Sequence, residues 1–142
     1  MSAQASTETG AFVLRVSLGV MYVAHSLILK YFVFTLAGTA QFFASLGLPP
    51  FLAYAVFWAE LIGGVALIVG VWPRAVALAL VPVLLGALWT HAGNGWVFSA
   101  ANGGWEYPLF LVVASVVQAL IGDGAYALAP TPVARVLQAR AA

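Results

Sequence analysis

The 142-residue sequence contains no cysteine and very few charged residues. Without cysteine, the chain cannot form disulfides, thiolate metal sites, iron–sulfur clusters or a cysteine nucleophile. Charged residues make up 6% of the chain, whereas soluble domains carry about 25%. Nine charges cannot cover the surface of a water-soluble globule, so a soluble enzyme or binding domain is excluded. The clustered lysines and arginines of a nucleic-acid-binding protein are also missing.

Apolar residues make up 64% of the sequence and gather in four stretches, at about 11–29, 51–72, 74–91 and 107–121. With a rise of about 1.5 Å per residue, the second stretch spans about 33 Å and crosses a hydrocarbon core. The fourth covers about 22 Å and has to recruit flanking residues, from Trp105 to about Ala127, to do the same. We therefore predict an all-α integral membrane protein, a four-helix transmembrane bundle over residues 11–128. Residues 1–10 and 129–142 are then short tails.

The segment from Gly38 to Leu48 lies between the first two stretches and is too short to span a membrane. Its phenylalanines and leucines share one side of a helix, and Pro49 and Pro50 end it. This pattern predicts a short interfacial helix.

The basic residues predict the orientation. Four spans put both termini on one side of the membrane, where Arg15, Arg74, Arg135 and Arg140 also lie, and leave only Lys30 on the other side. By the positive-inside rule, both termini are expected in the cytoplasm.

Glu60 is the most informative residue. It lies ten positions after Pro50, so about 15 Å deep and near the bilayer midplane. A carboxyl group at this depth is costly and usually faces the bundle interior with a partner. Two interpretations stay open: Glu60 is a hydrogen-bonding group that ties helices together, or it belongs to a proton or quinone site.

His25 shares one stripe of the first span with Leu18 and Tyr22. It is either an interhelical hydrogen bonder or a functional group, namely a proton-transfer group or a donor to a quinone carbonyl. Lys30 lies five residues later, about 140° around an α-helix from His25. This position predicts that its ammonium group reaches the outer interface.

His91 closes the third span and Glu106 opens the fourth, both on the outer side. Together with His25, Lys30 and Glu60 they predict a polar cavity that opens outward. No metal site is expected, because no His-x-x-His or Glu-x-x-His spacing occurs.

Arg15 lies inside the first span near the inner side, and Asp123 or the surface around Arg74 is its expected partner in an inner clasp. Ala59-xxx-Gly63 and Ala66-xxx-Gly70 predict a close approach to the second span, either by helices of this chain or by a partner subunit.

The order and spacing of these residues resemble the DoxX family of small bacterial and archaeal inner-membrane proteins with four helices. The resemblance rests mainly on Gln41-Phe-Phe-Ala-Ser-Leu-Gly-Leu-Pro49 and Glu60-Leu-Ile-Gly-Gly64, and covers about residues 11–128. The common family form has His-Gly with a lysine four residues after the histidine, whereas here Ser26 follows His25 and Lys30 is five away. The family's terminal Ser-x-Asp is replaced by a region with Ala127 and Ala129.

The resemblance implies a role associated with redox chemistry. Relatives are described as membrane subunits of quinone-reducing oxidoreductases, such as thiosulfate:quinone oxidoreductase, and as members of membrane complexes that handle oxidative stress. It also implies a bacterial inner-membrane location. The polar positions Glu60, His25, Lys30, His91 and Glu106 match those of the family.

The leading hypothesis is a subunit that binds a quinone or similar lipid-soluble ligand in the bilayer and acts with a partner redox protein. The chain carries no cofactor motif and no covalently bound cofactor is expected, so electrons would come from the partner or a substrate. Glu60 and His25 are the candidates for proton exchange. Bulky aromatic residues either line an apolar slot or face lipid. The full candidate ligand set is Tyr22, His25, Lys30, Phe57, Trp58, Glu60, Trp89, His91 and Glu106.

Two other classes of function stay open. One is a non-catalytic scaffold that anchors a larger complex or a homo-oligomer. The other is a small proton-conducting channel or transporter, which the absence of paired inverted halves disfavours.

Overall fold

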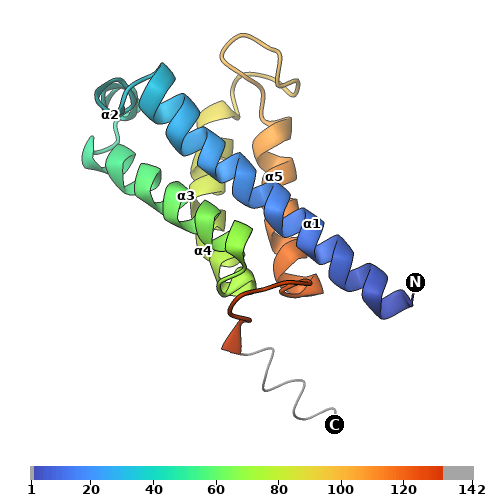
Figure 1. Ribbon diagram of the computed structural model, residues 1–142. Helices are drawn as coiled ribbons and strands as arrows, with labels where there is room; N and C mark the ends of the chain where they lie inside the picture. The colour runs from blue at the N-terminus through green and yellow to red at the C-terminus, as the bar shows by residue number, and fades with distance from the viewer. Residues whose placement is uncertain (1, 133–142) are drawn as a thin grey trace.

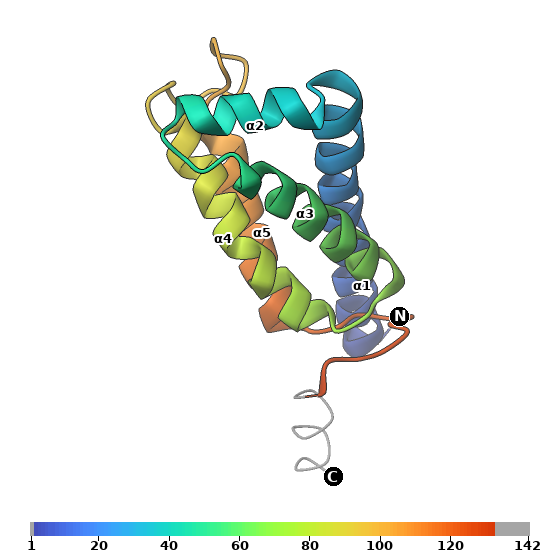
Figure 2. The same ribbon diagram turned by 90° about the vertical axis from the view of Figure 1, so that its left-hand side faces the viewer.

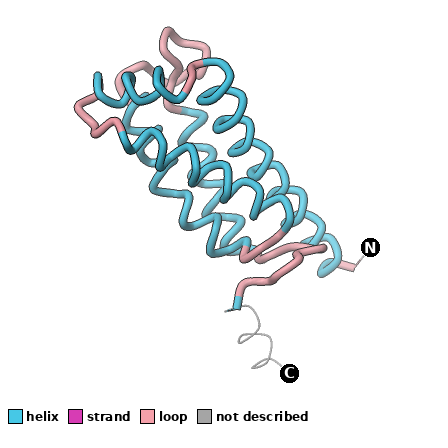
Figure 3. Tube along the Cα trace, turned by 60° about the vertical axis from the view of Figure 1, so that its left-hand side comes forward, coloured by secondary structure: helices cyan, strands magenta, loops and turns pink. Residues whose placement is uncertain are grey.

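The computed structural model of the protein describes residues 2–132, and its elements are helices. Figures 1 and 3 show the long helices running alongside one another, with the loops gathered at the two ends. The predicted all-α class is confirmed, since within residues 2–132 the only β feature is a single bridge between Val71 and Ala129. The helices are α1 (Ala3–Val23), its π-helical continuation η1 (Ala24–Val33), α2 (Leu36–Ser45), α3 (Phe51–Val69), α4 (Pro73–His91) and α5 (Glu106–Ile121).

Three of these helices are long and apolar enough to cross a membrane. They are the continuous 31-residue helix formed by α1 and η1, and the 19-residue helices α3 and α4. The chain is therefore a membrane helical bundle, as predicted. α5 has 16 residues, or about 24 Å of helix, and it ends at Ile121. The predicted extension to Ala127 is not helical, so the crossing of the membrane by α5 stays a prediction.

The first helix starts earlier and ends later than the sequence pattern indicates. It begins at Ala3 rather than Ala11, because the Ser2 hydroxyl accepts a hydrogen bond from the Ala5 amide at 3.2 Å and caps the helix. Most of the predicted N-terminal tail is therefore helical. Thr35, with a φ of 61°, separates η1 from α2 and caps α2 in the same way. Figure 2 shows α2 lying crosswise over one end of the bundle, in the place predicted for the interfacial helix.

Glycines allow the helices to approach closely. A Cβ atom added to Gly19 of α1 would lie 2.7 Å from the carbonyl oxygen of Gly64 in α3, so these two backbones are in direct contact. Gly63, on the neighbouring side of α3, faces Leu80 of α4, where an added Cβ would lie 2.8 Å from a side-chain methyl. Gly63 and Gly64 of α3 thus serve packing inside the chain, whereas Ala59 of the same predicted motif is exposed.

Arg15, which is fully buried, closes the end of the bundle where the chain begins. Its guanidinium donates to the carbonyl oxygens of Leu67 at 3.1 Å and Ala125 at 3.0 Å. Asp123 instead accepts hydrogen bonds from Thr131, from the hydroxyl at 2.6 Å and from the amide at 2.9 Å. The predicted inner clasp exists, but the expected partner Asp123 is wrong. A guanidinium at the C-terminus of α3 finds main-chain carbonyls that the helix leaves without partners.

The segment after α5 returns across this end of the bundle. Ala129 donates to Gly70 at 2.9 Å and accepts from Trp72 at 2.8 Å. Figure 1 places the start of α1 and the end of α5 at the same end, opposite α2. Arg135 and Arg140, and the rest of the predicted C-terminal tail from residue 133 onward, lie outside the described residues.

Candidate functional site

An ion pair lies inside the membrane bundle, between η1 and α3. The Lys30 ammonium group donates to the Glu60 carboxylate over 2.6 Å, and the two side chains are 16% and 8% exposed. Within residues 2–132 it is the one salt bridge. Glu60 therefore has the partner that its depth demands. The predicted position of Lys30 at the outer interface is wrong, because its ammonium turns inward to the carboxylate.

The π-helical geometry explains why the sequence pattern misplaced Lys30. Residues 24–33 form a π-helix, and its last bond runs from the Phe34 amide to the Leu29 carbonyl at 2.8 Å. A π-helix closes its hydrogen bonds between residues five apart, so such residues lie nearly above one another. His25 and Lys30 therefore come onto one side of the helix, rather than the 140° apart that an α-helix would give by about 100° per residue.

Tyr22 and His25 flank the pair on the same helix. His25 Nδ1 lies 2.8 Å from the carbonyl oxygen of Met21. Because a carbonyl can only accept, Nδ1 carries the proton and Nε2 is left as an acceptor in the neutral ring. Tyr22 is buried, and its hydroxyl lies 3.4 Å from the Ser115 hydroxyl of α5.

The aromatic candidates divide between the interior and the surface. Phe57 is buried one turn before Glu60 and packs near Tyr31, with ring centroids 6.3 Å apart. Trp58 and Trp89 are 55% and 59% exposed, so they lie on the outside of the bundle. In a membrane bundle, such outward aromatic residues face lipid or a partner.

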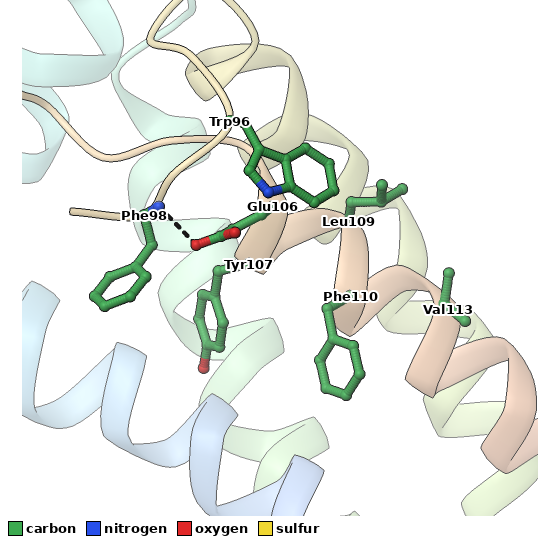
Figure 4. A pocket seen from close by; sticks show the side chains of 7 residues that line it. All are labelled: Trp96, Phe98, Glu106, Tyr107, Leu109, Phe110 and Val113. Carbon is green, nitrogen blue, oxygen red and sulfur yellow. Dashed lines mark hydrogen bonds between the residues drawn. The ribbon is translucent and has the colours of Figure 1, made fainter. Parts of the chain in front are cut away.

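His91 and Glu106 bind the loop between α4 and α5 rather than the ion pair. His91 Nδ1 donates to the carbonyl oxygens of Asn102 at 3.0 Å and Gly103 at 3.1 Å. The Glu106 carboxylate accepts from the Phe98 amide at 2.8 Å (Figure 4). The five ionisable groups predicted to line one cavity therefore have separate partners: Lys30 and Glu60 bind each other, and His91 and Glu106 bind the loop.

A hollow of about 480 Å³ does open beneath this loop, but its walls are mainly apolar. Figure 4 shows Tyr107 extending from the first turn of α5 toward α1. The Tyr107 ring stacks on His25 with centroids 6.0 Å apart, and its hydroxyl is buried. Of the five ionisable residues predicted to line a polar cavity, only Glu106 lines this hollow. The lining residues are Trp96, Phe98, Glu106, Tyr107, Leu109, Phe110 and Val113.

The buried polar residues Ser115 and Gln118 of α5, and the contact of Tyr107 with His25, were not predicted from the sequence. Ser115 and Gln118 are fully buried, and Tyr107 contacts His25. Their spacing of eight and three residues places them on one face of a helix, which was the available signal. No group of three or more His, Asp or Glu that could hold a metal ion occurs in the part of the chain that the structure describes.

The comparisons with known proteins agree with the resemblance. The DoxX family model matches residues 10–93, more than half of the chain. The chain belongs to the DoxX family. A relative from Bacillus subtilis (strain 168), named "Putative oxidoreductase CatD", is 36% identical over 125 residues, which cover 88% of each chain. No solved structure matches this DoxX protein.

The matched DoxX region contains the whole ion-pair site. Tyr22, His25, Lys30 and Glu60 all lie within residues 10–93, as does His91. The five-residue spacing between His25 and Lys30 coincides with the π-helix η1, which keeps the histidine and the lysine on one side.

Proposed function

We propose that this DoxX protein is an inner-membrane subunit that binds a quinone or similar lipid-soluble ligand beside the Lys30–Glu60 pair and acts with a partner redox protein. The observation that carries the proposal is the buried 2.6 Å ion pair in the interior of an apolar bundle. Ionisable residues inside a membrane mark functional pathways by default. The relative's name supports a link to oxidoreductases.

The donors around the pair fit the chemistry of such a ligand. A quinone ring presents two carbonyl oxygens, which accept hydrogen bonds but donate none. Within the described residues, Lys30 Nζ uses one of its three donors on Glu60. Phe57 supplies a buried apolar wall one turn away. A site with apolar walls and a few polar groups that fix orientation is the usual form of a small-molecule site.

Glu60 and His25 are then the groups that exchange protons with the ligand. The carboxylate holds the Lys30 ammonium in place, and the unprotonated Nε2 of His25 is able to accept a proton. Electrons come from the partner protein. Gly63 and Gly64 pack against helices of the same chain, so these two glycines are not free to form a subunit interface.

Native mass spectrometry of the protein, gently solubilised from its own membranes, tests the proposal. We expect a copurifying quinone mass in the wild type and a stoichiometric partner. Glu60→Gln removes the charge that holds Lys30, so it should lower quinone occupancy about tenfold. Glu8→Gln is the matched control, because Glu8 is exposed near the start of α1.

Lys30→Gln provides a second variant that removes the other half of the pair, and circular dichroism checks that each variant folds. A wild type that carries only lipids and a protein partner would contradict the quinone site and favour a scaffold. Equal quinone occupancy in Glu60→Gln and Glu8→Gln would place the ligand elsewhere.

A further inference from the structure

Polar side chains line the buried interface between α1 and α5. Arg15 and Tyr22 come from α1, and Ser115 and Gln118 come from α5. The relative exposure of these four residues is at most 4%. Side chains of this kind are rare in the interior of a membrane bundle, where they mark polar pathways.

Several polar atoms of this interface have no hydrogen-bond partner among residues 2–132. They are the Tyr107 hydroxyl, the Gln118 carbonyl oxygen and Arg15 Nε, and each is buried. Tyr22 and Ser115 add a long contact of 3.4 Å between hydroxyls. Native proteins satisfy such atoms with internal water, because an unpaired polar group is costly in a low-dielectric interior.

The polar groups follow one another along the bundle. Tyr22 meets Ser115 at the middle of α5, and Gln118 lies about 4.5 Å further toward the inner end. Gln118 Nε2 donates to the Gly122 carbonyl at 2.8 Å, so the amide oxygen is the end left to accept. Arg15 closes the inner end through its bond to Ala125.

Tyr22 also connects this interface to the ion pair. It packs on α3 at Gly64, where an added Cβ would lie 3.0 Å from the Tyr22 Cβ. Glu60 lies one helical turn before Gly64 on the same buried side of α3. One polar line therefore runs from Arg15 to the Lys30–Glu60 pair.

We propose that internal water molecules fill this line and exchange protons between the inner face and the Lys30–Glu60 pair. Hydroxyl groups and water both donate and accept hydrogen bonds, so a proton can pass along Gln118-bound water, Ser115 and Tyr22. The line serves local proton exchange, and it requires no quinone.

Hydroxyl-radical footprinting of the protein in nanodiscs tests the proposal, because radicals formed from internal water oxidise the side chains beside it. Tyr22 and Phe57 are matched, since both are 4% exposed and both lie on long apolar helices. The oxidation rate of each residue is divided by the rate of the same residue in the unfolded chain, which corrects for the different reactivities of tyrosine and phenylalanine. We then expect the corrected rate of Tyr22 to be several times that of Phe57. Equal rates in the wild type would overturn the proposal and make the polar line a dry, structural one.

Exchange of the Tyr22 hydroxyl proton is measured separately by infrared spectroscopy after the protein is transferred to D₂O. The band of Tyr22 is identified as the tyrosine band that is lost in Tyr22→Phe. We expect fast exchange in the wild type and in Ser115→Thr, which keeps the hydroxyl. Gln118→Leu should slow the exchange several-fold, and a matched thermal unfolding midpoint shows that the variant is folded. Unchanged exchange in folded Gln118→Leu would remove Gln118 from the path and contradict the proposed route.

Discussion

Arg15 shows how a charge is held inside this membrane protein without a charged partner. Among the described residues, its guanidinium donates only to main-chain carbonyls, those of Leu67, Ile68 and Ala125. Gly70 makes this arrangement feasible: its φ is +80°, and an added Cβ would collide with the Arg15 guanidinium. The glycine is thus needed both for the left-handed end of α3 and for the space that Arg15 fills.

Gly70→Ala should therefore destabilise the protein strongly. An alanine is strained in the left-handed backbone conformation of position 70, and its Cβ would displace the Arg15 guanidinium from its hydrogen bonds. Together these two effects should lower the free energy of unfolding by roughly 3 kcal/mol. SDS titration in mixed micelles measures this free energy. Gly86→Ala is the matched control, because Gly86 lies inside α4 with open space around its Cα, and it should change the value by less than about 1 kcal/mol. Equal effects of the two substitutions would refute the role assigned to Gly70.

At the scale of elements, η1 decides which side chains meet. The presence of a helix over this segment was predictable from its apolar pattern, but the position of Lys30 was not. Helical periodicity assumes about 3.6 residues per turn, and no residue between His25 and Lys30 signals a π-helix. What could be predicted was that Glu60 needs a partner, since that follows from depth alone.

The π-helix predicts opposite results for a deletion and an insertion in η1. Deleting Ile28, which is exposed, shortens the His25-to-Lys30 spacing to that of one α-helical turn and should keep the ion pair. Inserting an alanine after Ile28 rotates Lys30 away from Glu60. Because Lys30 is the only lysine of the chain, its acetylation by a membrane-permeant reagent, followed by mass spectrometry, reports on the pair directly.

We expect Lys30 to be protected in the wild type and in the deletion variant, and to react several times faster in the insertion variant. Glu60→Gln gives the reference rate for a lysine that has lost its partner. Protection in the insertion variant, or loss of protection in the deletion variant, would show that the register of η1 does not position Lys30.

At the scale of the whole molecule, the sequence predicted the number and order of the apolar helices better than their contacts. Helix number follows from apolar runs and composition, which one chain displays fully. The contacts depend on side chains far apart in sequence, such as Tyr22 with Ser115 and Arg15 with Ala125.

His91 and Glu106 were expected at a polar cavity because they lie at helix ends near other ionisable groups. The loop between them offers main-chain partners instead, and these satisfy both side chains.

The membrane topology gives a prediction that depends on α5. If α5 crosses the bilayer, Ser2 and Tyr126 lie on one side and Ser99, in the loop before α5, lies on the other. The absence of cysteine makes single substitutions of these three exposed residues by cysteine directly usable as labels. Under the positive-inside rule, an impermeant maleimide added to intact spheroplasts should label Ser99→Cys and leave Ser2→Cys and Tyr126→Cys unlabelled until the membrane is opened. Labelling of Tyr126→Cys together with Ser99→Cys would mean that the 16 residues of α5 do not cross the membrane. In that case α5 would lie at the membrane surface, and so would the polar line between α1 and α5.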